Sequence, residues 1–303
     1  MAISRSQLVK ELEPGLNALF GLEYKRYENQ HAEIYTAESS DRAFEEEVML
    51  SGFANAQVKG EGSGVSFDEA QETFTARYTH ETVALAFAIT EEAIEDNLYD
   101  RLASRYTKAL ARSMSNAKQV KAVEPLIQGL PSTDGFDSGD GVSLFNTSHP
   151  TVSGTFQNTL TTQADLNETS LEQSLIDIGQ MTDERGLRVA ARGVKMIIPS
   201  ELQFTAERLM KSQGRTSTAD NDINAIVSMG MIPQGYRVNN YLTDTDAFYI
   251  ITDIPNGMKM FNRAPLTTAM EGDFDTGNVR YKARERYSFG VSDPRGIFGV
   301  EGA

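Results

Sequence analysis

Apolar side chains recur at every fourth position through residues 91–121, a stretch that contains no glycine or proline. Residues four apart lie on one face of an α-helix, so the pattern predicts a long amphipathic helix. At a rise of about 1.5 Å per residue it would be ~45 Å long, long enough to be a beam against which other layers pack. The apolar stripe consists of Ile94, Leu98, Leu102, Tyr106, Leu110 and Met114, with Ala103, Ala109 and Ala117 beside it.

Both ends of this helix carry expected signals. Thr90 is a candidate N-cap, and the acidic residues directly after it suit the positive end of the helix dipole. Lys118 and Lys121 lie near the negative end. Pro125 predicts that the helix stops before it, because proline cannot continue the hydrogen-bond ladder.

The chain before residue 43 predicts an arm. Apolar positions at helical spacing predict a helix over residues 4–20, which Pro14 should divide into two pieces. The aromatic and charged segment that follows has few aliphatic residues with which to build a core of its own. We therefore expect this arm to pack on another element, in the same subunit or in the next.

Residues 43–90 predict a long β excursion. A strand from Phe44 to Leu50 leads out, and an alternating strand from Thr73 to Tyr78 leads back. The segment between them is polar and glycine-rich, so this long hairpin cannot bury a core. It must be a flexible loop or be ordered by neighbours. Residues 82–89 then form a strand that leads into the long helix.

The second half of the chain predicts a compact α/β unit. A glycine-rich and polar region from Pro125 to Asn167 marks the domain junction. Beyond it, alternating runs predict helices over 171–178, 202–210 and 223–227, and strands over 194–198, 236–242, 247–252 and 258–262. From Val279 the chain alternates again before a final apolar run.

Composition narrows the class of protein. The 303 residues include no cysteine, which removes disulfides, thiolate metal sites and cysteine nucleophiles. No apolar run is long enough to cross a membrane, and the N-terminus lacks a signal-peptide pattern, so we expect a soluble protein made in the cytoplasm. The net charge of −15 repels phosphate backbones and makes sequence-specific nucleic-acid binding a poor prediction, although a local basic patch stays open.

The sequence gives little support for a catalytic function. The three histidines are His31, His80 and His149. A serine hydrolase would pair one of them with a serine and a carboxylate, and Ser148 adjoins His149, but no nucleophile elbow is present. We expect a turn or capping role for His149. No catalytic residue is predicted.

Ligand-binding motifs are equally weak. Asp134, Asp137 and Asp140 recur in a glycine-rich loop, but three-residue spacing does not match a calcium loop, so we expect a solvated acidic loop and no metal. The glycine run GEGSGVS at residues 60–66 lacks the ending of a phosphate-binding loop and predicts a hairpin tip, with no cofactor. A basic cluster is more ambiguous. It contains Arg185, Arg188, Arg192 and Lys195, for which we favour acidic partners at a subunit interface over a phosphate or DNA contact.

The order of these elements, together with three runs of sequence, resembles the major capsid proteins of tailed bacteriophages, which have the Hong Kong ninety-seven-type fold. The runs are 144–150 (LFNTSHP), 195–210 (KMIIPSELQFTAERLM) and 283–303 (ARERYSFGVSDPRGIFGVEGA). The resemblance implies an α+β fold with an N-terminal arm reaching a neighbouring subunit, an extended loop, a peripheral domain and an axial domain. The implied boundaries are 1–42 for the arm, 48–78 for the extended loop, 43–47, 79–125 and 258–292 for the peripheral domain with spine helix 91–121, and 126–257 and 293–303 for the axial domain.

The resemblance also implies a function and partners. The chain would assemble with itself, as pentamers and hexamers, into an icosahedral virion shell around double-stranded DNA that it contacts non-specifically. A separate scaffolding protein and a portal are expected, because only about 40 residues precede the hairpin. Some relatives cross-link through a lysine on the loop, but Lys59 has no acidic and amide partners in the sequence, so we expect an ordinary salt contact or solvation. The alternatives are an encapsulin-like compartment of the same fold and, from a different class, a soluble hydrolase using His149.

Overall fold

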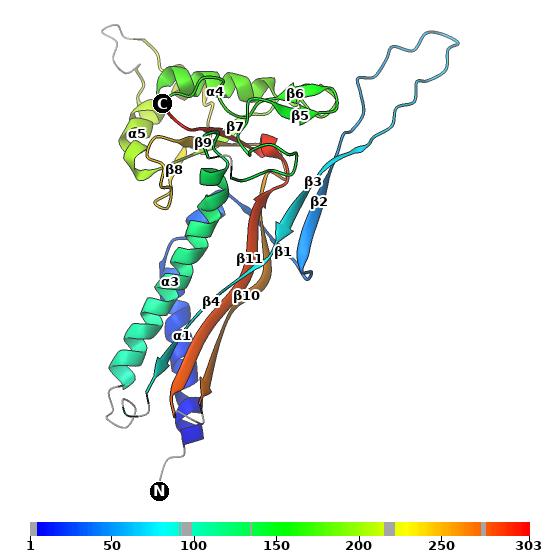
Figure 1. Cartoon of the computed structure of the whole chain (residues 1–303). Helices are drawn as coiled ribbons and strands as arrows, with labels where there is room; N and C mark the ends of the chain where they lie inside the picture. Colours follow the sequence, from blue (N-terminus) through cyan, green and yellow to red (C-terminus); the bar gives the residue numbers. More distant parts are fainter. Residues whose placement is uncertain (1–4, 91, 93–98, 134, 215–221, 274–276) are drawn as a thin grey trace.

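The computed structural model describes residues 5–90, 92, 99–133, 135–214, 222–273 and 277–303. Figure 1 shows a long body of helices and strands, a compact part at one end of it, and a hairpin that projects to one side. The described chain begins at the far end of the body, and the C-terminus lies in the compact part. In the described part of the chain, no helix is long and apolar enough to span a membrane.

Helices and two four-stranded sheets make up most of the molecule. The helices are α1 (Arg5–Arg26), α3 (Tyr99–Gln128), α4 (Glu168–Gln180), α5 (Gln203–Lys211) and α6 (Ala225–Met229). The sheet of the body has the order β1 (Thr36–Ser39), β10 (Met258–Gly272), β11 (Val279–Val291) and β4 (Glu81–Ile89). The sheet of the compact part has the order β12 (Ile297–Val300), β9 (Phe248–Thr252), β7 (Gly193–Ile198) and β8 (Tyr236–Val238).

Two short pairs and three turns of 3₁₀-helix complete the fold. The antiparallel pairs are β2 (Phe44–Leu50) with β3 (Glu72–Thr79), and β5 (His149–Thr151) with β6 (Gly154–Phe156). The 3₁₀ turns are η1 (Gln30–Glu33), η2 (Ser200–Leu202) and η3 (Pro294–Gly296). The predicted strand at 258–262 continues ten residues further as β10, because bulges against β11 interrupt the regular alternation by which a strand is recognised.

The N-terminal helix is continuous, so the predicted break at Pro14 was wrong. Proline removes one backbone hydrogen bond and costs roughly 3 kcal/mol inside a helix. The helix tolerates it because Leu16 and Phe20, in the following turns, are buried in a core with α3 and the sheet of the body. Tertiary packing thus outweighs the local penalty.

The long helix is also present, and it ends at Gln128, about two turns after the predicted end at residue 121. Pro125 lies inside α3, which continues to Gln128. Leu126, directly after the proline, is fully buried at the junction with the compact part, and this packing offsets the single lost backbone bond. Residues 91 and 93–98 of the predicted start, and the side chain of Leu102, lie outside the described part.

The buried face of α3 departs from a strict four-residue stripe. Each four-residue step turns the helix by about 400°, so the stripe drifts around the surface. Tyr106 is consequently 49% exposed and Ala109 is exposed. The buried face instead alternates steps of three and four and includes polar side chains. It consists of Ala103, Thr107, Leu110, Ala111, Met114, Ser115, Gln119, Ala122, Val123 and Leu126.

Helices α1 and α3 pack on each other and on the sheet of the body. A charged pair lies in this layer, where Lys118 Nζ is 3.1 Å from Glu285 Oε2. The Tyr24 hydroxyl is 3.5 Å from the same oxygen. Burial raises the pKa of Glu285 even though Lys118 and Tyr24 act in the opposite direction. Such a pair fixes which positions of α1, α3 and β11 meet more than it adds stability.

The arm that follows α1 packs on its own chain in the described part. The His31 backbone N–H donates to Gln119 Oε1 of α3 at 2.9 Å, and Gln119 Nε2 donates to His31 Nδ1 at 2.9 Å. Burial, with the nearby Lys118 cation, lowers the pKa of His31 to about 4, so its ring stays neutral and keeps an acceptor nitrogen. The Tyr35 hydroxyl donates to the Ala122 carbonyl at 2.7 Å. Residues 31–35 of the arm therefore pack on α3 of their own subunit.

The far end of α3 enters a second core that joins the body to the compact part. Val123 and Leu126 pack there with Ile197 of β7, Tyr249 of β9 and Tyr287 of β11. Helices α4, α5 and α6 cover the sheet of the compact part around a third core. One helix therefore contributes side chains to both ends of the molecule.

This arrangement predicts that substitutions at two valines three residues apart on α3 change the free energy of unfolding by very different amounts. Val123 is 1% exposed and Val120 is 47% exposed. Val123→Asp would bury an unpaired carboxylate in the junction core and should lower the free energy of unfolding by several kcal/mol, on the order of 3 or more. Val120→Asp should change it by less than about 0.5 kcal/mol. Thermal unfolding of the purified variants measures both changes in stability. Equal melting temperatures for the two variants would contradict the burial of this face of α3.

Candidate interaction surface

The projecting hairpin is the most exposed element of the molecule. Strands β2 and β3 pair from Phe44 and Thr79 up to Leu50 and Glu72. At the neck of the loop, the Ser51 N–H donates to the Gln71 carbonyl at 2.9 Å, and the Gln71 N–H donates to Ser51 Oγ at 3.0 Å. We call residues 51–71, which follow this neck and extend away from the body, the hairpin loop (Figure 1). Glycine and polar residues at its tip give it no core of its own.

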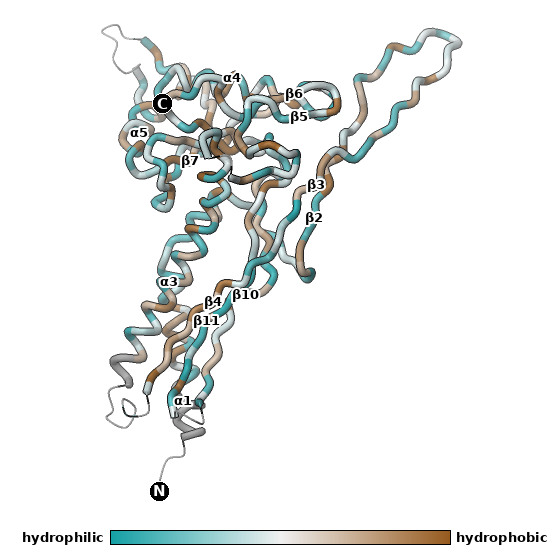
Figure 2. Tube along the Cα trace, viewed as in Figure 1, coloured by the Kyte–Doolittle hydropathy of each residue, from teal (hydrophilic) through white to brown (hydrophobic). Residues whose placement is uncertain are grey.

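Large apolar side chains of the hairpin loop face solvent. Val58 is 100% exposed and Phe67 is 97% exposed, and Phe53 and Val65 are each more than 60% exposed. Figure 2 shows these apolar positions interspersed with hydrophilic ones along both arms of the loop. Burying one such side chain contributes about 1.5–3 kcal/mol, so the loop gains considerably from any surface that covers it.

The base of the hairpin, in contrast, is fixed to the body. The Tyr78 ring packs edge-on against Phe261 with centroids 4.8 Å apart, and its hydroxyl is 2.5 Å from Ser292 Oγ. A Cβ at Gly290 would lie 2.6 Å from the same ring, so glycine is required for this contact. The hairpin therefore combines a rigid base with an uncovered tip.

An ion pair attaches one arm of the loop to the compact part. Asp68 Oδ1 accepts a hydrogen bond from Arg185 Nη2 at 2.5 Å, and Asp68 Oδ2 accepts one from the Ala54 N–H at 2.7 Å. The Ala54 N–H, followed by Arg185, lowers the pKa of Asp68. The carboxylate is exposed to solvent, so the pair sets a direction for the loop more than it adds stability.

His149 lies in a buried polar network and makes no catalytic pair with Ser148. Its Nδ1 is 2.6 Å from Asp140 Oδ2, and its Nε2 is 2.9 Å from Asn158 Oδ1. The Asn158 amide nitrogen donates to two carbonyls, which leaves its oxygen as the acceptor for Nε2–H. Both imidazole nitrogens are occupied and the ring is fully buried, whereas Ser148 is exposed. The predicted turn or capping role for His149 was wrong, because the residue begins β5 and stacks on Phe156.

The aspartates of the glycine-rich loop serve local hydrogen bonds. Asp137 accepts from the N–H groups of Gly139 and Gly141. Asp140 is buried, and burial alone would raise its pKa, but hydrogen bonds from His149 and Ser138 lower it overall. Asp134 lies outside the described part. Among the described residues, no group of three or more metal-ligating side chains is present.

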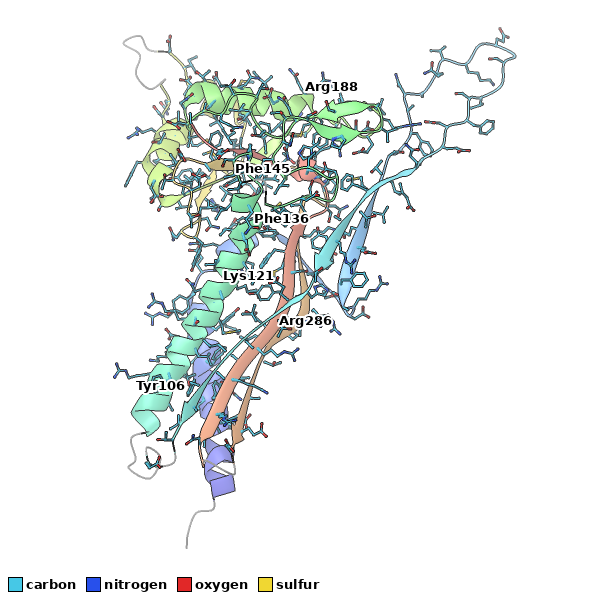
Figure 3. All side chains as sticks on the ribbon, in the orientation of Figure 1. Tyr106, Lys121, Phe136, Phe145, Arg188 and Arg286 are labelled. Carbon is cyan, nitrogen blue, oxygen red and sulfur yellow. The ribbon has the colours of Figure 1, made fainter. Side chains whose placement is uncertain are left out.

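The structure does not bring the predicted basic cluster together. Arg185 contacts Asp68, and Lys195 Nζ lies 2.7 Å from Glu33 Oε2. The Arg188 guanidinium donates to the Gln180 carbonyl, and the Arg192 backbone N–H donates to Asp253. These contacts lie within one chain, and the cations of Arg185, Arg188 and Lys195 reach different elements (Arg188 is labelled in Figure 3).

Sequence reasoning missed several partners of these residues. Asn158 connects His149 to the carbonyls of Leu144 and Pro294, and nothing in its local sequence distinguishes it from other loop asparagines. The Asp68–Arg185 pair joins residues 117 positions apart, so no spacing rule could find it. The other two histidines are also in structural roles. His31 bonds to Gln119, and His80 lies between Ser40 and Ser288.

Comparison with known proteins identifies relatives at the level of family and fold. A family model described as phage capsid protein matches residues 72–300. A search of the curated proteins gave no match. Among solved structures, the chain is similar to the capsid of an empty GTA particle, with a TM-score of 0.57 and 13% identity over 90% of this chain and 89% of that one.

Two further structures share this likeness. The capsid of Myoviridae phage XM1 gives a TM-score of 0.54 and 12% identity, with 89% of each chain covered. The virus-like particle from Pyrococcus furiosus gives a TM-score of 0.51 and 13% identity, with 94% of this chain and 98% of that one covered. At such identities the likeness is one of fold, and it confirms the predicted α+β architecture.

The network around His149 predicts a structural effect when it is broken. His149→Ala removes the partner of the buried Asp140 Oδ2 and one of the two partners of Asn158 Oδ1, and it leaves a cavity beside Phe156. The substitution should therefore lower the free energy of unfolding by about 3 kcal/mol or more. Ser148→Ala removes only an exposed hydroxyl and should have an effect below about 0.5 kcal/mol. Thermal unfolding tests both. If instead both variants unfolded like wild type and lost an esterase activity that wild type had, the hydrolase alternative would stand.

Proposed function

The chain belongs to the phage capsid protein family, and from this we propose that it is a major capsid protein whose copies assemble into an icosahedral shell. The proposal places it in the virion capsid of a tailed phage, around double-stranded DNA. The family match favours this reading over a cellular compartment of the same fold. The role is one of binding between copies, and we assign no residue a catalytic step.

The hairpin loop is the observation that carries the assembly mechanism. Ordering about 20 residues costs roughly 1–2 kcal/mol each in backbone entropy. The neck bonds and the Asp68–Arg185 pair account for only part of that order, and the apolar side chains stay exposed. A neighbouring copy that covers Val58 and Phe67 would bury them and supply the missing contacts. Each contact can be weak, because a closed shell multiplies it many times.

Within this proposal, the two ends of the molecule take different places in the shell. We assign the body, with 43–47, 79–125 and 258–292, to a peripheral domain. We assign the compact part, 126–257 with 293–303, to an axial domain near the centre of a pentamer or hexamer. The division is supported by separate cores in the two parts and by the junction core at the end of α3. Because α3 extends into this junction, the two domains would move together as one tile.

Further partners are proposed on the resemblance alone. A scaffolding protein and a portal would complete the assembly of the head. Packaged DNA would be contacted without sequence specificity, because a chain of net charge −15 repels phosphates overall. A shell whose wall is negatively charged would also bind the genome weakly, so that the DNA could enter and leave.

Shortening the hairpin tests the mechanism. Replacing residues 56–70 with an Asn-Gly turn should leave the subunit folded, because the base contacts of Tyr78 are untouched, but should abolish closed shells in electron micrographs. Phe67→Ser should weaken assembly in the same direction. Val152→Ser, at an exposed valine of the turn between β5 and β6, is the matched control and should assemble normally.

Normal shells from the shortened chain would overturn this role of the hairpin. The contents of wild-type particles made with their genomic neighbours separate the remaining alternatives. DNA inside supports a phage head, whereas an enzyme cargo would support the cellular compartment.

A further inference from the structure

The long helix carries a run of basic residues with no acidic residue among them. Residues 101–123 include six lysines and arginines and no aspartate or glutamate, although the whole chain has a net charge of −15. The two cations nearest the end of the run are paired, Lys118 with Glu285 and Lys121 with Glu81. The remaining cations whose side chains the structure describes are Arg105, Lys108 and Arg112.

These three cations lie on one exposed face of α3, which we call the basic face. Steps of three and four residues place them within about 60° of one another around the helix axis. All three side chains are exposed, and so are Tyr106 and Ala109 beside them. On the opposite side of this stretch, Leu110 and Ala111 pack with α1 and the sheet of the body, so the cations are held outward. In Figure 1 this half of α3 runs along the outside of the body.

The basic face has no counter-charge in the described part of the chain. The side chains of Arg105, Lys108 and Arg112 make no hydrogen bond or ion pair with any described residue. Like charges three and four residues apart on a helix repel one another, so the row weakens α3 slightly instead of stabilising it. The stability of the fold therefore does not account for the row, whereas an anionic partner would.

We propose that the basic face contacts the phosphates of double-stranded DNA. The inference rests on the proposed function and names the surface that packaged DNA would touch. Seven residues of helix separate the first cation from the last, so the row spans roughly 10 Å along the axis. A duplex carries about six phosphate charges over that length. The N–H donors of Arg and Lys form strong, charge-assisted hydrogen bonds with phosphate oxygens.

The packing of α3 limits this contact to the DNA backbone. A helix reads base edges by entering the major groove, which is about 12 Å wide and holds little more than one helix. Because α1 and the sheet of the body lie against α3, the helix cannot enter the groove without them. The basic face would therefore hold DNA through its phosphates, whatever the base sequence.

The side chains around the cations favour nucleic acid over an acidic protein as the partner. Interfaces between proteins have an apolar core at their centre. The exposed neighbours of the cations include the small or polar Ala109, Ser113 and Asn116, and the Tyr106 ring packs toward Phe87 with centroids 5.8 Å apart. A surface with cations and little exposed apolar area suits a contact with phosphates.

Removal of the three charges tests the contact in full-length protein. The variant carries Arg105→Gln, Lys108→Gln and Arg112→Gln, and glutamine is a good helix former. Fluorescence anisotropy of a labelled DNA duplex measures affinity at several salt concentrations. Three phosphate contacts should contribute about 2.7 to the slope of log K against log salt, so this slope should be smaller by about 2 to 3 in the variant. Its affinity at low salt should fall at least about tenfold.

Two matched controls and a milder variant accompany this measurement. Arg105→Lys with Arg112→Lys keeps the charges and should bind within about threefold of wild type. Arg192→Gln, Arg208→Gln and Lys211→Gln remove the same charge from exposed positions of the compact part and should leave the salt slope unchanged. Lys108→Gln alone should reduce the slope by about 0.9. Circular dichroism shows that each variant is folded.

Assembled particles separate this inference from the proposed function. The triple variant should form closed shells in normal yield, and its filled shells should release DNA on heating at a lower temperature than wild type. Equal salt slopes for wild type and the triple variant, or no binding by wild type, would overturn the inference. Loss of shells from the folded triple variant would assign the basic face to a contact between copies and also overturn it.

Competition identifies the class of partner. An unlabelled duplex should displace the labelled DNA at a lower concentration than a polyglutamate peptide of equal charge. The reverse order would assign the basic face to an acidic protein and overturn the inference. All of these outcomes leave the assembly of the wild-type protein untouched, whereas wild-type protein that forms no shells would contradict the proposed function itself.

Discussion

The packing of one face of α3 against two separate cores sets the geometry of the whole chain. In its middle, Leu110 and Met114 pack with α1 and the sheet of the body, and near its end, Val123 and Leu126 pack with the compact part. Each such side chain contributes about 1.5–3 kcal/mol on burial. Polar contacts lie between the two cores, where Lys118 meets Glu285 and Gln119 meets His31. These bonds fix the register of α3 against the arm and the sheet, so the two ends of the molecule cannot turn independently.

Because the body and the compact part are held rigidly together, the hairpin can form contacts with another copy without changing the shape of its own subunit. Its base is anchored by Tyr78, Phe261 and Gly290, so the direction in which it leaves the body is set by the tile. Beyond the neck, the chain has little to pack against, and its apolar side chains face solvent. A subunit of a shell needs this division, because tiles must keep their shape while their contacts form only between copies. The free energy of ordering the loop then becomes part of the free energy of assembly.

The fold was more predictable from the sequence than the contacts of its polar residues. Period-four and period-two patterns predicted the long helix, the hairpin strands and most of the compact part, because each buries one face. Pro14 and Pro125 misled the prediction, since their local cost is offset by the packing of Phe20 and Leu126 in later turns. Polar side chains on the buried face of α3, such as Gln119, were not predicted to be buried, because a hydrophobic pattern assigns polar side chains to solvent.

The features of the candidate interaction surface were also only partly predictable from the sequence. The glycine-rich composition of residues 51–71 indicated a loop without a core, and the structure shows its apolar side chains exposed. The Asp68–Arg185 pair and the Asn158 network depend on residues brought together only by the tertiary fold. The alternation of β11 was visible in the sequence after Val279, but only the position of α1 and α3 shows which face of this strand is open.

The central claim is that the hairpin loop is ordered by a neighbouring copy, and hydrogen exchange measures this directly. Amides from Val58 to Ala70 should exchange quickly in free subunits, because few of them are bonded within the chain, and should slow markedly in assembled particles. Amides of α3 around Leu110 to Leu126 provide the internal reference and should be protected in both states. Equal protection of the loop in free and assembled protein would contradict the claim.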